Sequence, residues 1–147
     1  MSKSDVSDPT SSRPAATFPL GAAALCDVVA VVVFVLIGRA NHHDGFALIG
    51  VLQTLWPFLI GAAAGWSIAY VYSHIGSSEW FGSDFRPARI VPAGLVIWVC
   101  TVAIGRVLRY LLHQGVALSF IIVATIALGV FLLGWRAIVA YAMRKYF

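Results

Sequence analysis

Charge is scarce in this chain. Asp, Glu, Lys and Arg make up only 11% of its 147 residues, whereas they make up about 25% of soluble domains. Hydrophobic residues make up 61%, and the mean hydropathy is +0.90. This composition excludes an ordinary soluble domain and predicts an integral membrane protein.

Several other features are missing. The basic residues form no contiguous run of the kind found in nucleic-acid-binding arms, so no nucleic-acid partner is expected. Cys26 and Cys100 are the only cysteines, both within apolar segments, and we expect free thiols. No GxSxG, HExxH, Walker or GxGxxG motif stands in a suitable context. We therefore expect no enzyme, no cofactor and no metal.

Four apolar windows are long enough to cross the hydrocarbon layer, which is roughly 30 Å thick and takes about 20 helical residues. They are residues 18–38, 46–72, 90–112 and 117–143. No window shows the alternation typical of barrel strands, so helices are expected. We predict an all-α membrane domain of four transmembrane helices over residues 18–147. Residues 1–17, rich in Ser, Asp and Pro, are expected to form a disordered cytoplasmic tail.

The connections predict how the helices are paired. Residues 39–45 and 113–116 are short enough to make two antiparallel helical hairpins. Short motifs recur between the hairpins: Ile37, Gly38 and Arg39 as Ile104, Gly105 and Arg106, and Gly65 and Trp66 as Gly134 and Trp135. These matches indicate a duplicated hairpin related by a pseudo-twofold axis along the membrane normal. Chance similarity between short apolar stretches is the alternative.

The basic residues predict an orientation. With a cytoplasmic N-terminus, six of them lie inside and three toward the outside: Lys3, Arg13, Arg86, Arg89, Arg144 and Lys145 against Arg39, Arg106 and Arg109. The positive-inside rule favours this arrangement. We expect a multi-pass plasma-membrane protein with both termini in the cytoplasm. Within the longest connection, residues 73–89, we expect Trp80, Phe81 and Phe85 to be anchors at the membrane interface.

Asp27 is the only charged residue between Phe18 and Gly38, and a carboxylate within a span is costly. At 1.5 Å per residue, Asp27 lies about 13 Å from Phe18, and Arg136 lies about 10 Å from Met143. Both residues then occupy the inner third of the membrane and can form a charge pair if the first and fourth spans are neighbours. A structural lock is the favoured interpretation, and a proton- or ion-linked transport site is the alternative.

A second polar group is expected at the outer ends of the spans. It consists of Arg39, His42, His43, Asp44, Arg106, Arg109 and His113. The group is suited to an anion or a lipid phosphate, whereas adjacent histidines alone are too few for a tight metal site. We favour the simpler interpretation that the arginines extend to lipid headgroups and interact with the ends of helix dipoles.

Two features of the second span concern its packing. Gly61 and Gly65 form a GxxxG motif with alanines between them, which favours close approach of another helix, within the chain or between copies. Pro57 removes one helical hydrogen bond and predicts a kink near the middle of the span.

A set of residues spread over all four spans resembles a known family. It comprises Asp27, Phe34 to Arg39, His42, Trp56 to Phe58, Gly61, Gly65, Trp66, Arg109, Gln114, Gly115, Ser119, Phe120 and Leu133 to Arg136. Over residues 23–138 the chain resembles the domain of unknown function 3054, a family of actinobacterial and haloarchaeal membrane proteins. The resemblance implies a four-helix plasma-membrane protein and no particular activity.

The favoured function is that of a small structural or accessory membrane protein that acts through helix contacts. Its expected partners are the lipid bilayer and either a second copy or another membrane protein, with Gly61 and Gly65 forming part of the contact between copies. The alternative is a small ion or solute transporter, or a channel subunit, that uses Asp27 and Arg136. A third alternative is a lipid-modifying enzyme that uses the outer polar group.

Overall fold

Four long helices dominate the computed structural model, which describes residues 17–41, 45, 47–75, 85–114 and 117–146. They are α1 (Leu20–Asn41), α2 (Leu48–Ile75), α3 (Leu95–Leu111) and α4 (Leu118–Tyr146), with a short π-helical segment, η1 (Ile90–Gly94), leading into α3. Each, with η1 and α3 taken together, is long and apolar enough to cross a membrane. The predicted all-α, four-span fold class is therefore confirmed. The predicted tail lies outside the described residues except for Thr17.

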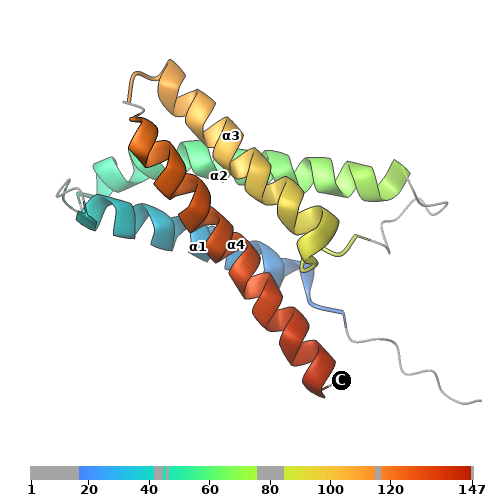
Figure 1. The fold of residues 1–147 in the computed structure, drawn as a ribbon. Coiled ribbons are helices and arrows are strands. Elements are labelled where there is room, and N and C mark those ends of the chain that lie inside the picture. The colour runs from blue at the N-terminus through green and yellow to red at the C-terminus, as the bar shows by residue number, and fades with distance from the viewer. Residues whose placement is uncertain (1–16, 42–44, 46, 76–84, 115–116, 147) are drawn as a thin grey trace, which may run out of the picture.

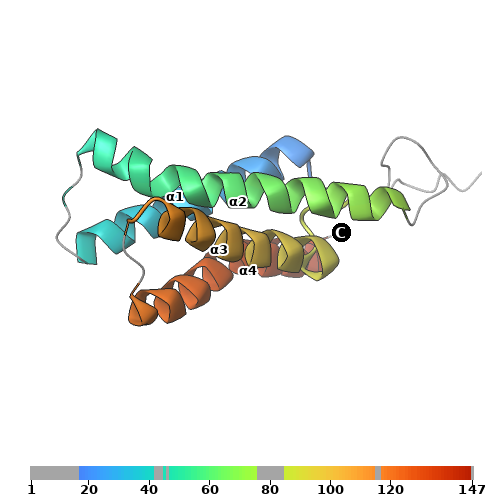
Figure 2. The ribbon, with the colours of Figure 1, turned by 90° about the horizontal axis from the view of Figure 1, so that it is seen from above.

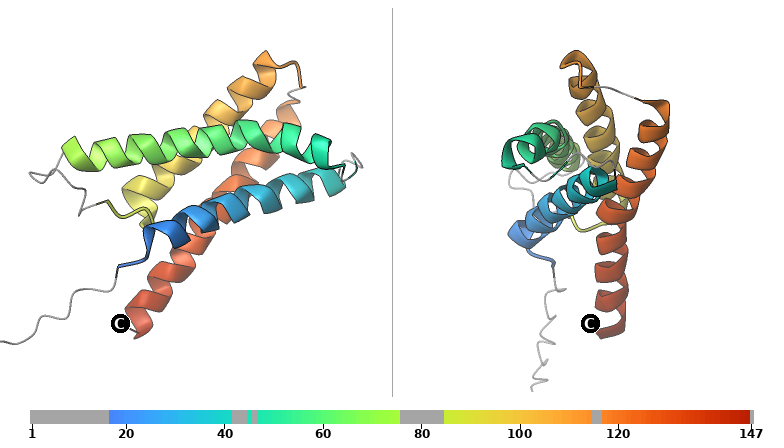
Figure 3. Two further views of the ribbon diagram at one scale, coloured as in Figure 1. Left: turned by 180° about the vertical axis from the view of Figure 1, so that it is seen from behind. Right: turned by 90° about the vertical axis from the view of Figure 1, so that its left-hand side faces the viewer.

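Successive helices run in opposite directions, so the starts of α1 and α3 and the ends of α2 and α4 lie at one end of the molecule (Figure 1). The α1 and α2 pair crosses the α3 and α4 pair obliquely (Figures 1 and 3). The most extensive packing joins α2 to α3, which lie side by side (Figure 2). Since this contact lies between the expected hairpins rather than within either, the hairpin duplication stays a prediction.

Gly61 and Gly65 let α2 approach α3 closely, and both are buried. A Cβ at Gly61 would lie 2.9 Å from Thr101 Cα, and a Cβ at Gly65 would lie 2.7 Å from Ile97 Cα. The GxxxG motif is therefore a helix contact within one chain. The expectation that this face joins two copies is wrong, because α3 already covers it.

An apolar core positions α1 against its neighbours. Phe34 of α1 meets Phe58 of α2 edge to face, with ring centroids 5.3 Å apart. Phe58 packs in turn on Gly105 of α3, where a Cβ would come within 2.5 Å of the ring. Val31 belongs to the same cluster. Asp27 lies one helical turn before Val31, so it projects from the same face of α1 as this core residue.

The outer surface of the helices is apolar. Helix α4 exposes large apolar side chains along much of its length, namely Leu118, Ile122, Val123, Ile126, Val130 and Ile138. Soluble proteins rarely expose so extended an apolar surface. Contact with lipid tails accounts for it, which agrees with the predicted bilayer environment.

Pro57 lies inside α2 and is buried. The ribbon of α2 bends within its N-terminal half, which contains Pro57 (Figure 2). Proline has no N–H to donate, and its ring displaces the carbonyl four residues earlier, so Pro57 accounts for the bend.

The glycine contact generates a first prediction. Gly65→Ala is expected to lower the free energy of unfolding by about 1–3 kcal/mol, because the added methyl group would overlap the α3 backbone. Thermal unfolding in detergent measures the change. Gly134→Ala is the matched control, since Gly134 likewise precedes a tryptophan but has no atom within 4 Å of a built Cβ. Equal destabilisation by both variants would contradict the close approach.

Candidate functional site

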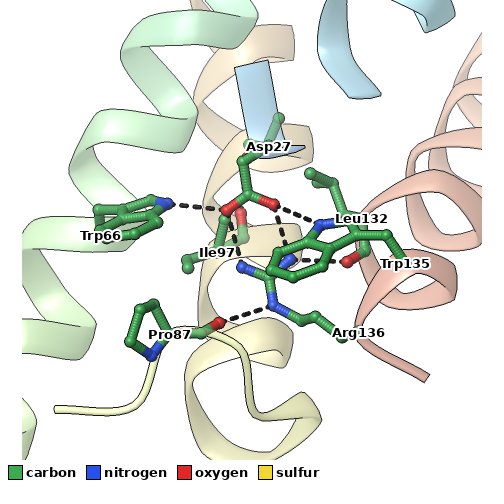
Figure 4. A network of polar contacts seen from close by, with 8 residues as sticks. Asp27, Trp66, Pro87, Ile97, Leu132, Trp135 and Arg136 are labelled. Carbon is green, nitrogen blue, oxygen red and sulfur yellow. Dashed lines mark hydrogen bonds and ion pairs between the residues drawn. The ribbon is translucent and has the colours of Figure 1, made fainter. Parts of the chain in front are cut away.

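A buried ion pair joins α1 to α4. Asp27 is 1% exposed and Arg136 is fully buried. Arg136 Nη1 donates to Asp27 Oδ1 and Arg136 Nη2 donates to Asp27 Oδ2, each at 2.7 Å (Figure 4). Two parallel charge-assisted hydrogen bonds are the strongest arrangement that arginine and a carboxylate adopt. The structure thus brings together the two charges that were expected at similar depth.

Two tryptophans complete the surroundings of the carboxylate. Trp66 Nε1 of α2 donates to Asp27 Oδ2 at 2.8 Å, and Trp135 Nε1 of α4 donates to Asp27 Oδ1 at 2.9 Å. Figure 4 shows the two indoles approaching the carboxylate from different helices. Each oxygen therefore accepts one indole and one guanidinium hydrogen bond. Since a carboxylate has about four acceptor sites, its capacity is filled.

The guanidinium of Arg136 is held from its other sides as well. Nε donates to the carbonyl oxygen of Pro87 at 2.8 Å, and Nη1 also donates to that of Leu132 at 2.6 Å. The group lies 4.4 Å from the ring centroid of Trp135, within range of a cation–π contact. A Cβ at Gly94 would lie 2.8 Å from Arg136 Cδ. Glycine at position 94 thus leaves room for the stem of this side chain.

A second aromatic ring packs against each of the two indoles. Phe85 meets Trp66 with ring centroids 5.6 Å apart, and Phe18 meets Trp135 at the same separation. Phe85 also packs on Tyr70, 5.4 Å away. Phe85, expected as an interface anchor, therefore packs against α2, whereas Trp80 and Phe81 lie outside the described residues.

The geometry indicates what the pair can do chemically. Two charges in a low-dielectric interior are costly unless their hydrogen-bonding capacity is met. The carboxylate accepts four hydrogen bonds, and the guanidinium uses four of its five N–H groups. Every one of these partners is a fixed protein group. The arrangement stabilises one relative position of the helices and offers no open coordination site.

The outer arginines fall into two groups. Arg39 Nη1 donates to Thr54 Oγ1 at 3.1 Å, so Arg39 ties the end of α1 to α2. Arg106 and Arg109 lie over the ring of Phe120 instead, at 5.5 and 5.4 Å from its centroid. A cavity of about 50 Å³, with Arg39 and Arg109 on its wall, separates the groups. Its volume suits water molecules.

The histidines of the outer group add little that can be described. His42, His43 and Asp44 lie outside the described residues, and His113 is exposed. The outer anion or headgroup site therefore stays a prediction.

Within the described ranges, no three His, Cys, Asp or Glu side chains gather closely enough to hold a metal ion. Cys26 and Cys100 are free thiols there, as predicted.

Sequence reasoning identified the charge pair but missed its indole donors. The repeat of Gly65 and Trp66 as Gly134 and Trp135 is the signal in the sequence that points to these donors. A buried indole N–H needs an acceptor. Two tryptophans expected at similar positions in their spans could have been matched to Asp27, the carboxylate within a predicted span.

The indole contacts generate a second prediction. Trp66→Phe and Trp135→Phe each remove one N–H donor but keep an aromatic ring. Each is expected to cost about 1.5–3 kcal/mol of unfolding free energy, the range for hydrogen bonds to charged groups. Thermal unfolding in detergent measures the loss. Trp56→Phe is the control, because Trp56 is exposed on α2. A comparable loss at Trp56 would contradict a specific role for the two indoles.

The chain matches the model of the family described as "Protein of unknown function (DUF3054)" over residues 24–139. This range contains the ion pair and both indole donors. Neither the curated proteins nor the solved structures provide a match. Because the family model spans most of the sequence, the chain belongs to the DUF3054 family.

Proposed function

We propose that this chain is a small structural or accessory protein of the plasma membrane, that it acts through helix contacts, and that Asp27 and Arg136 are its structural lock. The hydrogen bonding of the pair, which fills the carboxylate and uses four of the five N–H groups of the guanidinium, supports this proposal. A transport site has to exchange a proton or an ion. Here any exchange would break several buried or part-buried hydrogen bonds at once. A lock is therefore a better account of the pair than a transport pathway.

The reach of the network also supports a lock. Its hydrogen bonds connect α1, α2, α4 and the segment before η1, through Asp27, Trp66, Arg136 and Pro87. Helix α3 is held separately by its close contact with Gly65 of α2. One network and one glycine face together hold all four helices.

The surface through which such a protein would act is the outer face of α4. This face carries exposed apolar side chains, among them Ile122, Ile126 and Val130. In a bilayer, helices associate through close van der Waals packing rather than through exclusion of water. The face is therefore suited to a helix of a partner membrane protein as well as to lipid tails.

The proposed topology has both termini in the cytoplasm. Four basic residues, Arg86, Arg89, Arg144 and Lys145, belong to segments at the end of the molecule where α1 begins and α4 ends (Figure 1). Exposed tyrosines occupy the last turns of α2 and α4, for example Tyr72 and Tyr146. Basic residues favour the cytoplasmic side, and tyrosines favour the interface.

The lock generates a third prediction. Asp27→Asn is expected to lower the free energy of unfolding by about 3–5 kcal/mol, because Arg136 would remain charged in a buried site without its counter-ion. Arg136→Gln is expected to cost a similar amount. The double variant should lose less than the sum, since neither buried charge remains. Denaturant unfolding in detergent measures all three, with Arg144→Gln, an exposed site on the same helix, as the control.

Flux measurements on the same proteins separate the lock from transport. The purified wild-type protein in liposomes is expected to leave imposed proton and anion gradients intact. A flux that Asp27→Asn abolishes, while the variant keeps its helix content and melting temperature, would contradict the lock and favour a transporter.

The topology generates a fourth prediction. Alkaline phosphatase, which requires disulfides, is expected to be inactive when fused after Phe147 and active when inserted in the 113–116 connection. A fluorescent protein fused after Phe147 should fluoresce. Colony assays in a bacterial host measure both reporters. The inverse pattern would place the termini outside.

A further inference from the structure

A cavity of about 570 Å³ opens where α1 begins and α4 ends. Its walls come from residues 17–20, from residues 85–91 and from three residues of α4, namely Val139, Ala140 and Met143. Ligand pockets in proteins typically measure about 300–1,000 Å³. The cavity is thus large enough for a substantial organic group.

The lining is apolar on one side. Phe18 contributes from just before α1, Leu20 from its first residue, Ile90 from η1, and Val139 and Met143 from the last turns of α4. These residues belong to the ends of three predicted spans, where the hydrocarbon layer meets the headgroups. An acyl chain matches such a wall.

The other side of the lining is cationic. Arg86 and Arg89 are the charged residues of the lining, and both are exposed. Neither side chain forms an ion pair or a hydrogen bond with the described part of the chain. In the described part of the chain no carboxylate pairs with these two arginines, so they can attract an anion, and phosphate oxygens match the planar donor geometry of a guanidinium.

The lock holds this cationic rim in place. Pro87, between the two arginines, is buried, and its carbonyl oxygen accepts a hydrogen bond from Arg136 Nε at 2.8 Å. Pro87 lies within a turn in which Arg89 N–H donates to the Arg86 carbonyl oxygen at 3.1 Å. Arg89 O accepts from Gly94 N–H at 3.0 Å. The backbone beneath both arginines is therefore fixed before any ligand arrives, which lowers the entropy cost of binding.

We propose that this cavity binds an anionic phospholipid of the bilayer, with its phosphate at Arg86 and Arg89 and an acyl chain along the apolar wall. Basic pockets at the ends of transmembrane helices are suited to such headgroups. Neither Asp27 nor Arg136 lines the cavity, so a failure of lipid binding would leave the lock intact.

Native mass spectrometry of the full-length protein in a neutral detergent tests the proposal, with phosphatidylglycerol and phosphatidylcholine as probes. Phosphatidylglycerol is expected to bind at least about tenfold more tightly than phosphatidylcholine, because only its headgroup carries a net negative charge. The double variant Arg86→Gln, Arg89→Gln should lose this preference. Ala140→Trp should weaken binding of both lipids, because the indole would occupy the acyl-chain side without changing any charge.

Arg144→Gln, Lys145→Gln is the matched control. It removes the same charge at the same end of the molecule, but neither residue lines the cavity, so the preference should persist. Thermal unfolding verifies that each variant is folded. An equal loss in the control would overturn the proposal in favour of nonspecific attraction. Unchanged binding in Ala140→Trp, or displacement of the lipid by inorganic phosphate, would overturn it in favour of a site for a free anion.

Discussion

The carboxylate of Asp27 accepts hydrogen bonds from three side chains on two other helices, and the position of α1 depends on them. Apart from Asp27, α1 is apolar until its last turn, and apolar helices in lipid have little to fix their rotation or depth. A buried ion pair contributes little net stability compared with apolar packing, but it strongly penalises every arrangement that separates its members. The pair therefore selects one register of α1 against α2 and α4.

The same network shows how far the two halves of the chain are alike. Trp66 and Trp135 occupy matching Gly-Trp motifs and perform the same task, each donating to one oxygen of Asp27. The charges have no such counterparts. The predicted match of Ile37 with Ile104 corresponds to a shift of 67 residues. The same shift takes Asp27 to Gly94, where the absence of a side chain leaves room for the stem of Arg136. Ser67, which follows Trp66 as Arg136 follows Trp135, is exposed and hydrogen-bonded within its own helix. One half supplies the carboxylate, and the other supplies the cation and the space for it.

Hydropathy and depth were sufficient to predict the four spans and to select Arg136 as the partner of Asp27, because both depend on distances along single helices. Contacts between helices were not predictable in this way. The GxxxG face indicated close packing but could not indicate that α3 would cover it, since the motif is the same for a neighbour within the chain and for a second copy. Depth alone also suggests that Asp27 and Arg136 could exchange positions, because it describes them only as two opposite charges at the same level of the membrane. With two indole N–H groups directed at position 27, an arginine there would meet donors instead of acceptors, so exchanging the residues would not restore the network.

The hydrogen bond from Arg136 Nε to the Pro87 carbonyl oxygen connects the lock to the cavity. Through this bond the cavity depends on the lock, but the lock does not depend on the side chains of the cavity. Loss of the guanidinium would remove one of the hydrogen bonds that hold the turn carrying Arg86 and Arg89, so the cationic rim would be less firmly fixed. Loss of those exposed arginines would leave the Pro87 carbonyl and the buried charges where they are, because a backbone oxygen makes the connection. A change in the lock is therefore transmitted to the rim of the cavity, whereas a change in the side chains of the rim is not transmitted to the lock. The geometry of the cavity therefore depends in part on the burial of Asp27 and Arg136.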